Sequence, residues 1–230
     1  MERIGRKMMV LVMLIISTPT MLWAQDVQTK EQKDANYVKM ITDRAAKIVA
    51  TLGLTNADAS IRVRDIISQQ YSDLNQIHEA KNLKLKVAKE IAKDDKVKSE
   101  ADIKQAEAEA NVAMDKLHGE YLKKLSKELS ASQVEMVKDG MTYKVLPITY
   151  KGYQEMLPNL TNEQKTQILA YLTEAREHAM DAESSEKKHA WFGKYKGRIN
   201  NYLSAAGIDM KKAGLEWEQR IAAAKASKQN

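Results

Sequence analysis

The chain of 230 residues contains no cysteine, three prolines, nine glycines and a single phenylalanine. The lack of cysteine excludes disulfides, thiolate metal sites, cysteine nucleophiles and a lipid anchor on cysteine. Sandwiches and barrels need many turns, so the small number of glycines and prolines argues against those classes. The composition is 43% apolar and 30% charged and is rich in Lys, Glu and Ala, which favours helices. We therefore predict an all-α protein.

The first 24 residues have the pattern of a secretory signal peptide. A basic start precedes the apolar run Met8–Ile16, and residues 22–24 suit a cleavage before Gln25. A membrane span needs about 18–20 continuous apolar residues. This run has nine before residues 17–20 interrupt it, so we expect no stable span after cleavage. Retention of the segment as an anchor is the alternative. We predict a periplasmic or secreted protein whose mature chain starts at residue 25.

Positive charge is concentrated near the end of the chain. Removal of residues 1–24 takes three basic residues and one acidic residue from a chain of net charge +6 and leaves +4. So mild an excess argues against a dedicated nucleic-acid binder. Residues 187–212, however, contain seven basic residues and only one acidic residue, Asp209. The partner that fits this segment is acidic, such as a glycan that contains uronates.

Apolar residues recur at spacings of three and four along six segments, which predicts six helices. Their ranges are Gln32–Leu52, Asn56–Lys93, Ser99–Leu129, Asn162–Ala182, Ser185–Ala206 and Asp209–Ala226. The second and third are long and are joined by a short reversal, so they should lie antiparallel. We predict one helical domain over residues 25–230, with a long N-terminal antiparallel hairpin and a C-terminal helical cluster.

The pattern is irregular over Asp139–Asn159, which contains Pro147, Gly152 and Pro158. We predict a long loop here, with at most a short extended piece. Loops of this length are uncommon in compact domains and are often functional. The loop is expected to cover the C-terminal cluster as a lid that carries three tyrosines, namely Tyr143, Tyr150 and Tyr153.

A short phrase that caps helix starts occurs at Leu160–Gln164 and Leu129–Gln133, with a looser copy at Leu54–Asp58. The Thr or Ser hydroxyl accepts from a backbone N–H, and the side chain three residues later accepts from the backbone N–H of the Thr or Ser. The phrase also resembles the LTxxQ motif of small periplasmic stress chaperones. That resemblance provides an alternative function, a chaperone-like or protein-interaction module.

Aromatic and polar side chains share one face of the predicted helix Ser185–Ala206. Flat rings beside amide and cationic donors suit a sugar, because sugars present weakly apolar C–H faces and many hydroxyls. The alternative is that the rings form the edge of the core, with Arg198 stacked over one of them. The candidate binding residues on this helix are Trp191, Tyr195, Arg198, Asn200, Asn201 and Tyr202.

The preceding helix carries candidate acid–base residues, because Glu174, His178 and Asp181 share one face and His189 follows after a short turn. The alternative is a solvated face with one Glu–His pair. These residues lack a compact metal-ligand spacing such as H-E-x-x-H, so we predict no metal site. The chain contains no P-loop, no G-x-G-x-x-G and no G-x-S-x-G, and we predict no cofactor.

Some residues stand out against their helical surroundings. Gln70, His78 and Arg176 fall in or beside apolar stripes, and we predict that they are buried and hydrogen-bonded. Gly193 and Gly197 lie within a helix, where glycine costs about 1 kcal/mol relative to alanine. We therefore expect a neighbouring helix or a ligand to approach the backbone there.

Four runs, at Arg44–Thr55, Arg62–Ile67, Glu174–Ala182 and Lys188–Leu203, resemble a family of secreted, mostly helical proteins. The family is a domain of unknown function, found in polysaccharide-degrading Gram-negative bacteria and labelled sugar-binding. The resemblance covers nearly all of the mature chain and implies an extracytoplasmic location and a role with glycans. It assigns no catalytic or binding residue to this chain.

Together these features favour a non-catalytic carbohydrate-binding or glycan-handling protein. The chaperone-like module is the first alternative. A glycan-active enzyme that uses Glu174, His178, Asp181 and His189 is the second. The sequence defines neither the ligand nor the oligomeric state.

Overall fold

A computed structural model describes residues 29–93 and 95–227. Its secondary structure over those residues consists of eight helices and no strand, which confirms the all-α prediction. The helices are α1 Lys30–Val49, α2 Ala57–Ile91, α3 Lys96–Glu128, α4 Ala131–Met141, α5 Val145–Met156, α6 Asn162–Met180, α7 Ser185–Ala205 and α8 Met210–Ala226. The predicted signal peptide lies outside the described residues. In the part of the chain that is described, no helix is long and apolar enough to span a membrane.

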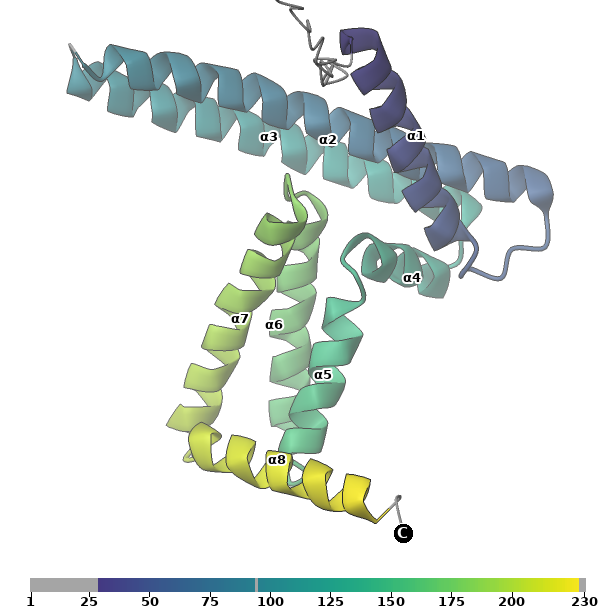
Figure 1. The fold of residues 1–230 in the computed structure, drawn as a ribbon, viewed down its shortest axis with the longest axis vertical. Helices are drawn as coiled ribbons and strands as arrows, with labels where there is room; N and C mark the ends of the chain where they lie inside the picture. The colour runs from purple at the N-terminus through teal and green to yellow at the C-terminus, as the bar shows by residue number, and fades with distance from the viewer. Residues whose placement is uncertain (1–28, 94, 228–230) are drawn as a thin grey trace, which may run out of the picture.

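The helices form two groups (Figure 1). The long helices α2 and α3 lie side by side and antiparallel, and α1 packs across α2 at an angle. The antiparallel pair α6 and α7 packs with α5, and α8 crosses the far end of this group. The groups meet where α4 packs between them and where the α6–α7 turn approaches the middle of the α2–α3 hairpin. This second meeting point positions the site described below.

Local capping explains where several helices begin. Thr161 and Ser130 form the predicted capping boxes of α6 and α4 with the glutamines three residues later. The cap predicted from the looser third copy is wrong by one residue. Asn56 rather than Thr55 caps α2, and its side chain accepts a hydrogen bond from the Ala59 N–H. Asn and Thr both place an oxygen acceptor at the cap, so the boundary moves by one residue.

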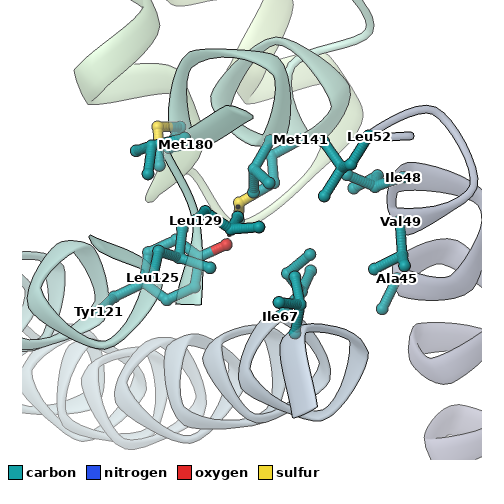
Figure 2. Packing of buried hydrophobic residues seen from close by; sticks show 13 residues of the cluster. Ala45, Ile48, Val49, Leu52, Ile67, Tyr121, Leu125, Leu129, Met141 and Met180 are labelled. Carbon is teal, nitrogen blue, oxygen red and sulfur yellow. Dashed lines mark hydrogen bonds between the residues drawn. The ribbon is translucent and has the colours of Figure 1, made fainter. Parts of the chain in front are cut away.

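Each group has its own hydrophobic core. The first contains buried side chains of α1 to α4, together with Met180 at the end of α6 (Figure 2). The second lies among α5, α6 and α7 and includes Phe192, Tyr195 and Ile199. Met180 is fully buried in the first core although the other buried apolar residues of α6 belong to the second. The end of α6 is therefore anchored in the N-terminal group.

The prediction of an irregular loop over Asp139–Asn159 is wrong. Most of this segment is helical, because α4 continues to Met141 and α5 begins at Val145. Tyr143 and Lys144 adopt left-handed φ angles of 58° and 57°, which break the chain direction in a tight turn. Pro147 is tolerated because it lies in the first turn of α5, where no helical N–H bond is lost. With the loop absent, the three tyrosines do not form a loop lid.

Glycine has a packing role at a position that the sequence pattern did not identify. A Cβ on Gly140 of α4 would lie 2.9 Å from Cγ1 and 3.0 Å from Cγ2 of Ile48 in α1. By contrast, a Cβ on Gly193 or Gly197 would meet no heavy atom within 4 Å. Among the described residues, no neighbouring helix fills the space of a Cβ at these two glycines, so that part of the expectation is wrong. Close approach of two helices instead requires the glycine of α4.

We predict opposite effects for two glycine-to-alanine substitutions. Gly140→Ala should lower the free energy of unfolding by about 1–3 kcal/mol, because the new Cβ overlaps the branched atoms of buried Ile48. Gly193→Ala should raise it by up to about 1 kcal/mol, because alanine is the better helix former at an open position. Urea unfolding measures both. A Gly140→Ala protein as stable as the unsubstituted one would contradict the α1–α4 packing.

Candidate binding cleft at the helical junction

A cleft of about 680 Å³ lies where the α6–α7 turn meets the hairpin, and we call it the junction cleft. Its size falls within the range of small-molecule sites, about 300–1,000 Å³. One wall comes from the hairpin and the other from the end of α6, the turn and the first half of α7. The lining residues are His78 and Lys81 of α2; Asn111, Met114 and Asp115 of α3; and His178, Asp181, Ala182, Glu183, Lys187, Ala190, Trp191 and Lys194.

An aromatic pair forms part of the second wall. The imidazole of His178 stacks on the indole of Trp191, with ring centroids 4.4 Å apart and planes 17° apart. The Nζ atom of Lys194, one turn further along α7, lies 4.8 Å from the centroid of the indole. Trp191 is half-buried and also packs against the second core. The indole is therefore held in place while part of it remains accessible.

His118 of α3 joins the two walls of the cleft through contacts with the end of α6. Its Nδ1 lies 2.7 Å from Oδ2 of Asp181, and its Nε2 lies 3.2 Å from Oε2 of Glu177. Because each ring nitrogen faces a carboxylate oxygen, both nitrogens donate and the imidazole carries a positive charge. The hydrogen bonds to Asp181 and then to Glu177 raise the pKa of His118 to about 9. The C-terminal end of α6 is thereby joined to α3 by a doubly paired imidazolium.

Further charged contacts connect α6 to α4. Lys138 donates to both carboxylate oxygens of Glu177, at 3.1 and 3.2 Å. Burial alone would raise the pKa of Glu177, but the hydrogen bonds from His118 and Lys138 outweigh it and lower the pKa to about 2. The buried guanidinium of Arg176 donates to Asp139 at 2.7 Å and also pairs with Glu135. Charged groups of α3, α4 and α6 therefore alternate in sign across the junction.

The α6–α7 turn is held by donors from both of its sides. Nε2 of buried His78 lies 2.8 Å from the carbonyl oxygen of Asp181, so this nitrogen carries the proton and donates. Lys188 of α7, which is 7% exposed, donates to the carbonyl of Met180 at 3.1 Å. Burial lowers the pKa of Lys188 to about 8. These bonds use the free carbonyls at the end of α6, which a helix C-terminus always leaves unpaired.

Of the predicted binding residues on α7, Trp191 lines the junction cleft and the others lie outside its lining. Tyr195 is 2% exposed and its ring lies under the guanidinium of Arg198, whose Cζ is 4.6 Å from the centroid. Tyr195 is therefore not a surface for a sugar, and it matches the alternative of a ring at the edge of the core with Arg198 stacked over it. Tyr202 is half-buried and packs edge-on against Tyr171.

The remaining predicted binding residues lie outside the cleft lining. Asn200 accepts a hydrogen bond of 2.7 Å from the hydroxyl of buried Tyr153, which joins α7 to α5. Asn201 is exposed, and Tyr150 packs against the second core. Tyr143 is exposed and stacks on His189, with centroids 5.7 Å apart.

The four acid–base candidates are not gathered at one point. His178 and Asp181 line the junction cleft, whereas Glu174 and His189 are outside its lining. Glu174 lies 3.7 Å from Arg198 instead of holding His178. Within residues 29–93 and 95–227, no three His, Cys, Asp or Glu side chains are arranged to hold a metal ion.

The residue that joins α3 to the end of α6, His118, was not among the sequence candidates. A signal was present, since His118 follows Met114 by four residues and precedes Tyr121 by three, on the apolar side of α3. The burial predicted for Gln70, His78 and Arg176 is confirmed. His78 and Arg176 have hydrogen-bond partners, whereas Nε2 of Gln70 has none among the described residues.

We predict that His118 makes stability fall with rising pH. Its pKa is raised from 6.5 to about 9 in the folded state, so the folded chain retains a proton that the unfolded chain releases, and stability decreases above pH 6.5. Lys188 has the opposite effect above about pH 8, because its lowered pKa makes the folded chain release a proton that the unfolded chain retains. Urea unfolding between about pH 6.5 and pH 8 should therefore show the decrease in stability for the unsubstituted protein.

His118→Gln should remove that pH dependence and lower the free energy of unfolding by about 1–3 kcal/mol near neutral pH, because two half-buried carboxylates lose a charged hydrogen-bond donor while Glu177 keeps Lys138. His189→Gln, at an exposed position, is the matched control and should keep the original profile. An unchanged profile in His118→Gln would contradict the paired imidazolium.

Comparison with known proteins identifies the family of the chain. The model of a family described as "Protein of unknown function (DUF3826)" matches residues 38–223, a range that contains α2 to α7 and the whole junction cleft. Among curated proteins, none matches. Because the family model covers most of the chain, the protein belongs to the DUF3826 family.

Proposed function

We propose that the junction cleft binds a saccharide and that the protein handles glycans without transforming them. The observation that carries the proposal is the indole of Trp191, held against His178 in the wall of a cleft of about 680 Å³. The indole offers a flat apolar surface for the C–H face of a sugar ring once the sugar displaces the exposed side chain of Lys194, which lies over the ring. Its attachment to the second core keeps it oriented before a ligand arrives.

The polar groups around Trp191 suit a ligand with many hydroxyls. Asn111 and Asp115 of α3 lie on the opposite wall, so amide and carboxylate groups are available as donors and acceptors. Ligand sites typically combine an apolar surface with a few polar groups that fix orientation. The junction cleft has both features.

Three lysines and three carboxylates line the cleft, but Asp181 and Glu183 are paired with His118 and Lys187, so two lysines remain against Asp115 and favour a glycan that carries acidic groups. Lys81 and Lys194 line the cleft on opposite walls. Two further lysines, from the basic segment 187–212, contribute less to the attraction of an acidic ligand, since Lys187 is paired with Glu183 and Lys188 is buried. A carboxylate of a uronate between Lys81 and Lys194 would gain electrostatic attraction that salt weakens.

The geometry supports binding more strongly than catalysis. A general acid or base must reach the reacting atoms with a free proton or lone pair. Asp181, the candidate acid in the lining, is 18% exposed and is paired with His118. His178 lines the cleft but lacks a carboxylate partner that would orient it as a base, since Glu174 lies against Arg198 instead. The same proposal places the protein in the periplasm or outside the cell, because residues 1–24 have the pattern of a secretory signal.

A glycan array on the purified protein tests the proposal, with an aromatic substitution as the decisive variant. For each glycan that the unsubstituted protein binds on the array, Trp191→Ala should weaken binding by about tenfold or more, which is equivalent to about 1.4 kcal/mol. Trp217→Ala is the matched control, because Trp217 is also half-buried but lies on α8, away from the cleft lining. It should bind as the unsubstituted protein does.

A protein that binds no glycan on the array would remove the proposal. Equal binding by Trp191→Ala and Trp217→Ala would show that any glycan site lies elsewhere. The preference for acidic glycans is tested separately by raising the salt concentration. Binding to uronate-containing glycans should weaken more than binding to neutral ones, and an equal response would contradict a role for Lys81 and Lys194.

A further inference from the structure

The far half of the α2–α3 hairpin extends beyond the C-terminal helices (Figure 1). One side of this extension has a groove of about 390 Å³, which we call the hairpin groove. Leu83 and Val87 of α2 lie in it and are 65% and 54% exposed, although both are large and apolar. Across from them, α3 contributes Asp102, Ala106 and Glu109.

The hairpin groove lies on the side of the hairpin that faces away from the C-terminal helices. Successive residues of a helix are rotated by about 100°. Leu83 and Val87 are therefore rotated by about 140° and 180° from His78, which contacts the α6–α7 turn. On α3, Glu109 is rotated by about 180° from His118, which also contacts α6. Both helices thus present the groove to open solvent, with the junction cleft on the reverse side.

Charge is distributed unequally between the two helices of the extension. Residues 80–93 contain five lysines and one glutamate, whereas residues 96–112 contain four acidic residues and three lysines, and the acidic residues of α3 that line the groove are Asp102 and Glu109. The same division occurs inside the groove, where Lys84 of α2 lies opposite Glu109 of α3 and pairs with it. A surface that is basic along one edge and acidic along the other complements a copy of itself.

We propose that the hairpin groove is a dimer interface occupied by a second copy of this chain. The two copies are related by a two-fold axis parallel to the hairpin. Such an axis preserves the height of each residue along the hairpin and exchanges the two edges, so α2 of one copy lies antiparallel to α3 of the other. Lys84 then faces Glu109 across the interface as well as within its own chain.

This arrangement satisfies the apolar and steric requirements too. Leu83 and Val87 of both copies become buried in the middle of a four-helix bundle, the packing typical of paired helical hairpins. Because the grooves face away from the C-terminal helices, the two C-terminal groups project to opposite sides and do not collide. An isologous contact of this kind closes on itself and limits the assembly to two copies.

The first test is the mass of the purified protein by light scattering over a range of concentrations. The unsubstituted protein should approach twice the mass of one chain as its concentration rises, and higher salt should weaken the association. Leu83→Glu should remain monomeric, because it buries an unpaired charge at the interface. Ile148→Glu is the matched control, since Ile148 of α5 is 66% exposed and lies outside the groove. It should dimerise normally.

A charge exchange identifies which helices meet. Lys84→Glu and Glu109→Lys should each be monomeric, because each places like charges opposite one another. Mixing the two variants should restore a dimer, because the substituted side chains of the two chains then meet as opposite charges, and so do the unsubstituted ones. A contact that is only within one chain cannot be restored by mixing. Circular dichroism confirms that each variant is folded.

A protein that is monomeric at all concentrations, or a dimer that Leu83→Glu leaves intact, would overturn the proposal. Mixing without recovery would overturn the pairing of α2 with α3. Suppression of the aggregation of unfolded proteins by a monomer, lost in Leu83→Glu, would assign the groove to another occupant and would likewise overturn it. Glycan binding is independent of all these outcomes.

Discussion

The arrangement of the two helical groups depends on an imidazolium held between two carboxylates. The first core belongs to α1–α4 and the second to α5–α7, and Met180 is the buried apolar residue of α6 that enters the first core. Apolar burial therefore stabilises each group more than it stabilises their contact. His118, paired with Asp181 and Glu177, supplies a directional contact between α3 and α6. Removing His118 is costly, because the half-buried carboxylates of Asp181 and Glu177 lose a charged hydrogen-bond donor.

The same contact forms one edge of the junction cleft. Asp181 is bonded to His118 through its side chain, accepts from His78 through its carbonyl, and lines the cleft. Moving the end of α6 would move the first half of α7 with it, and so would move Trp191 relative to Asn111 and Asp115 on the hairpin. The width of the cleft is thus set by polar bonds whose strength depends on protonation. Under the proposed function, ligand affinity should therefore depend on the protonation of His118.

Sequence periodicity predicted α1 to α3, α6 to α8 and much of the burial, but it missed α4 and α5 and the contacts between groups. Repeats of three and four residues define α2, α3, α6 and α7, because each buries a continuous stripe. Gly140, Pro147 and Gly152 suggested a loop, yet Gly140 serves the approach of α4 to Ile48 and Pro147 occupies a first helical turn. Composition alone does not distinguish a glycine that breaks a helix from one that allows two helices to touch.

The candidate site shows the same division. Trp191, His178 and Asp181 were recognisable because aromatic and titratable residues share helix faces. Tyr195 has the same spacing but is covered by Arg198, since its position around α7 lies closer to the second core. His118 is separated from Asp181 by 63 residues, and no local pattern connects them. Partners that meet only through tertiary packing are not readable from one sequence.

The most direct test of this account is a titration of the His118 imidazole by nuclear magnetic resonance, assigned by comparison with His118→Gln. A charged imidazole that donates to both Asp181 and Glu177 predicts a titration midpoint of about 9. A midpoint near 6.5, the ordinary value of histidine, would show that the ring is not held between the two carboxylates and would contradict the account of the junction.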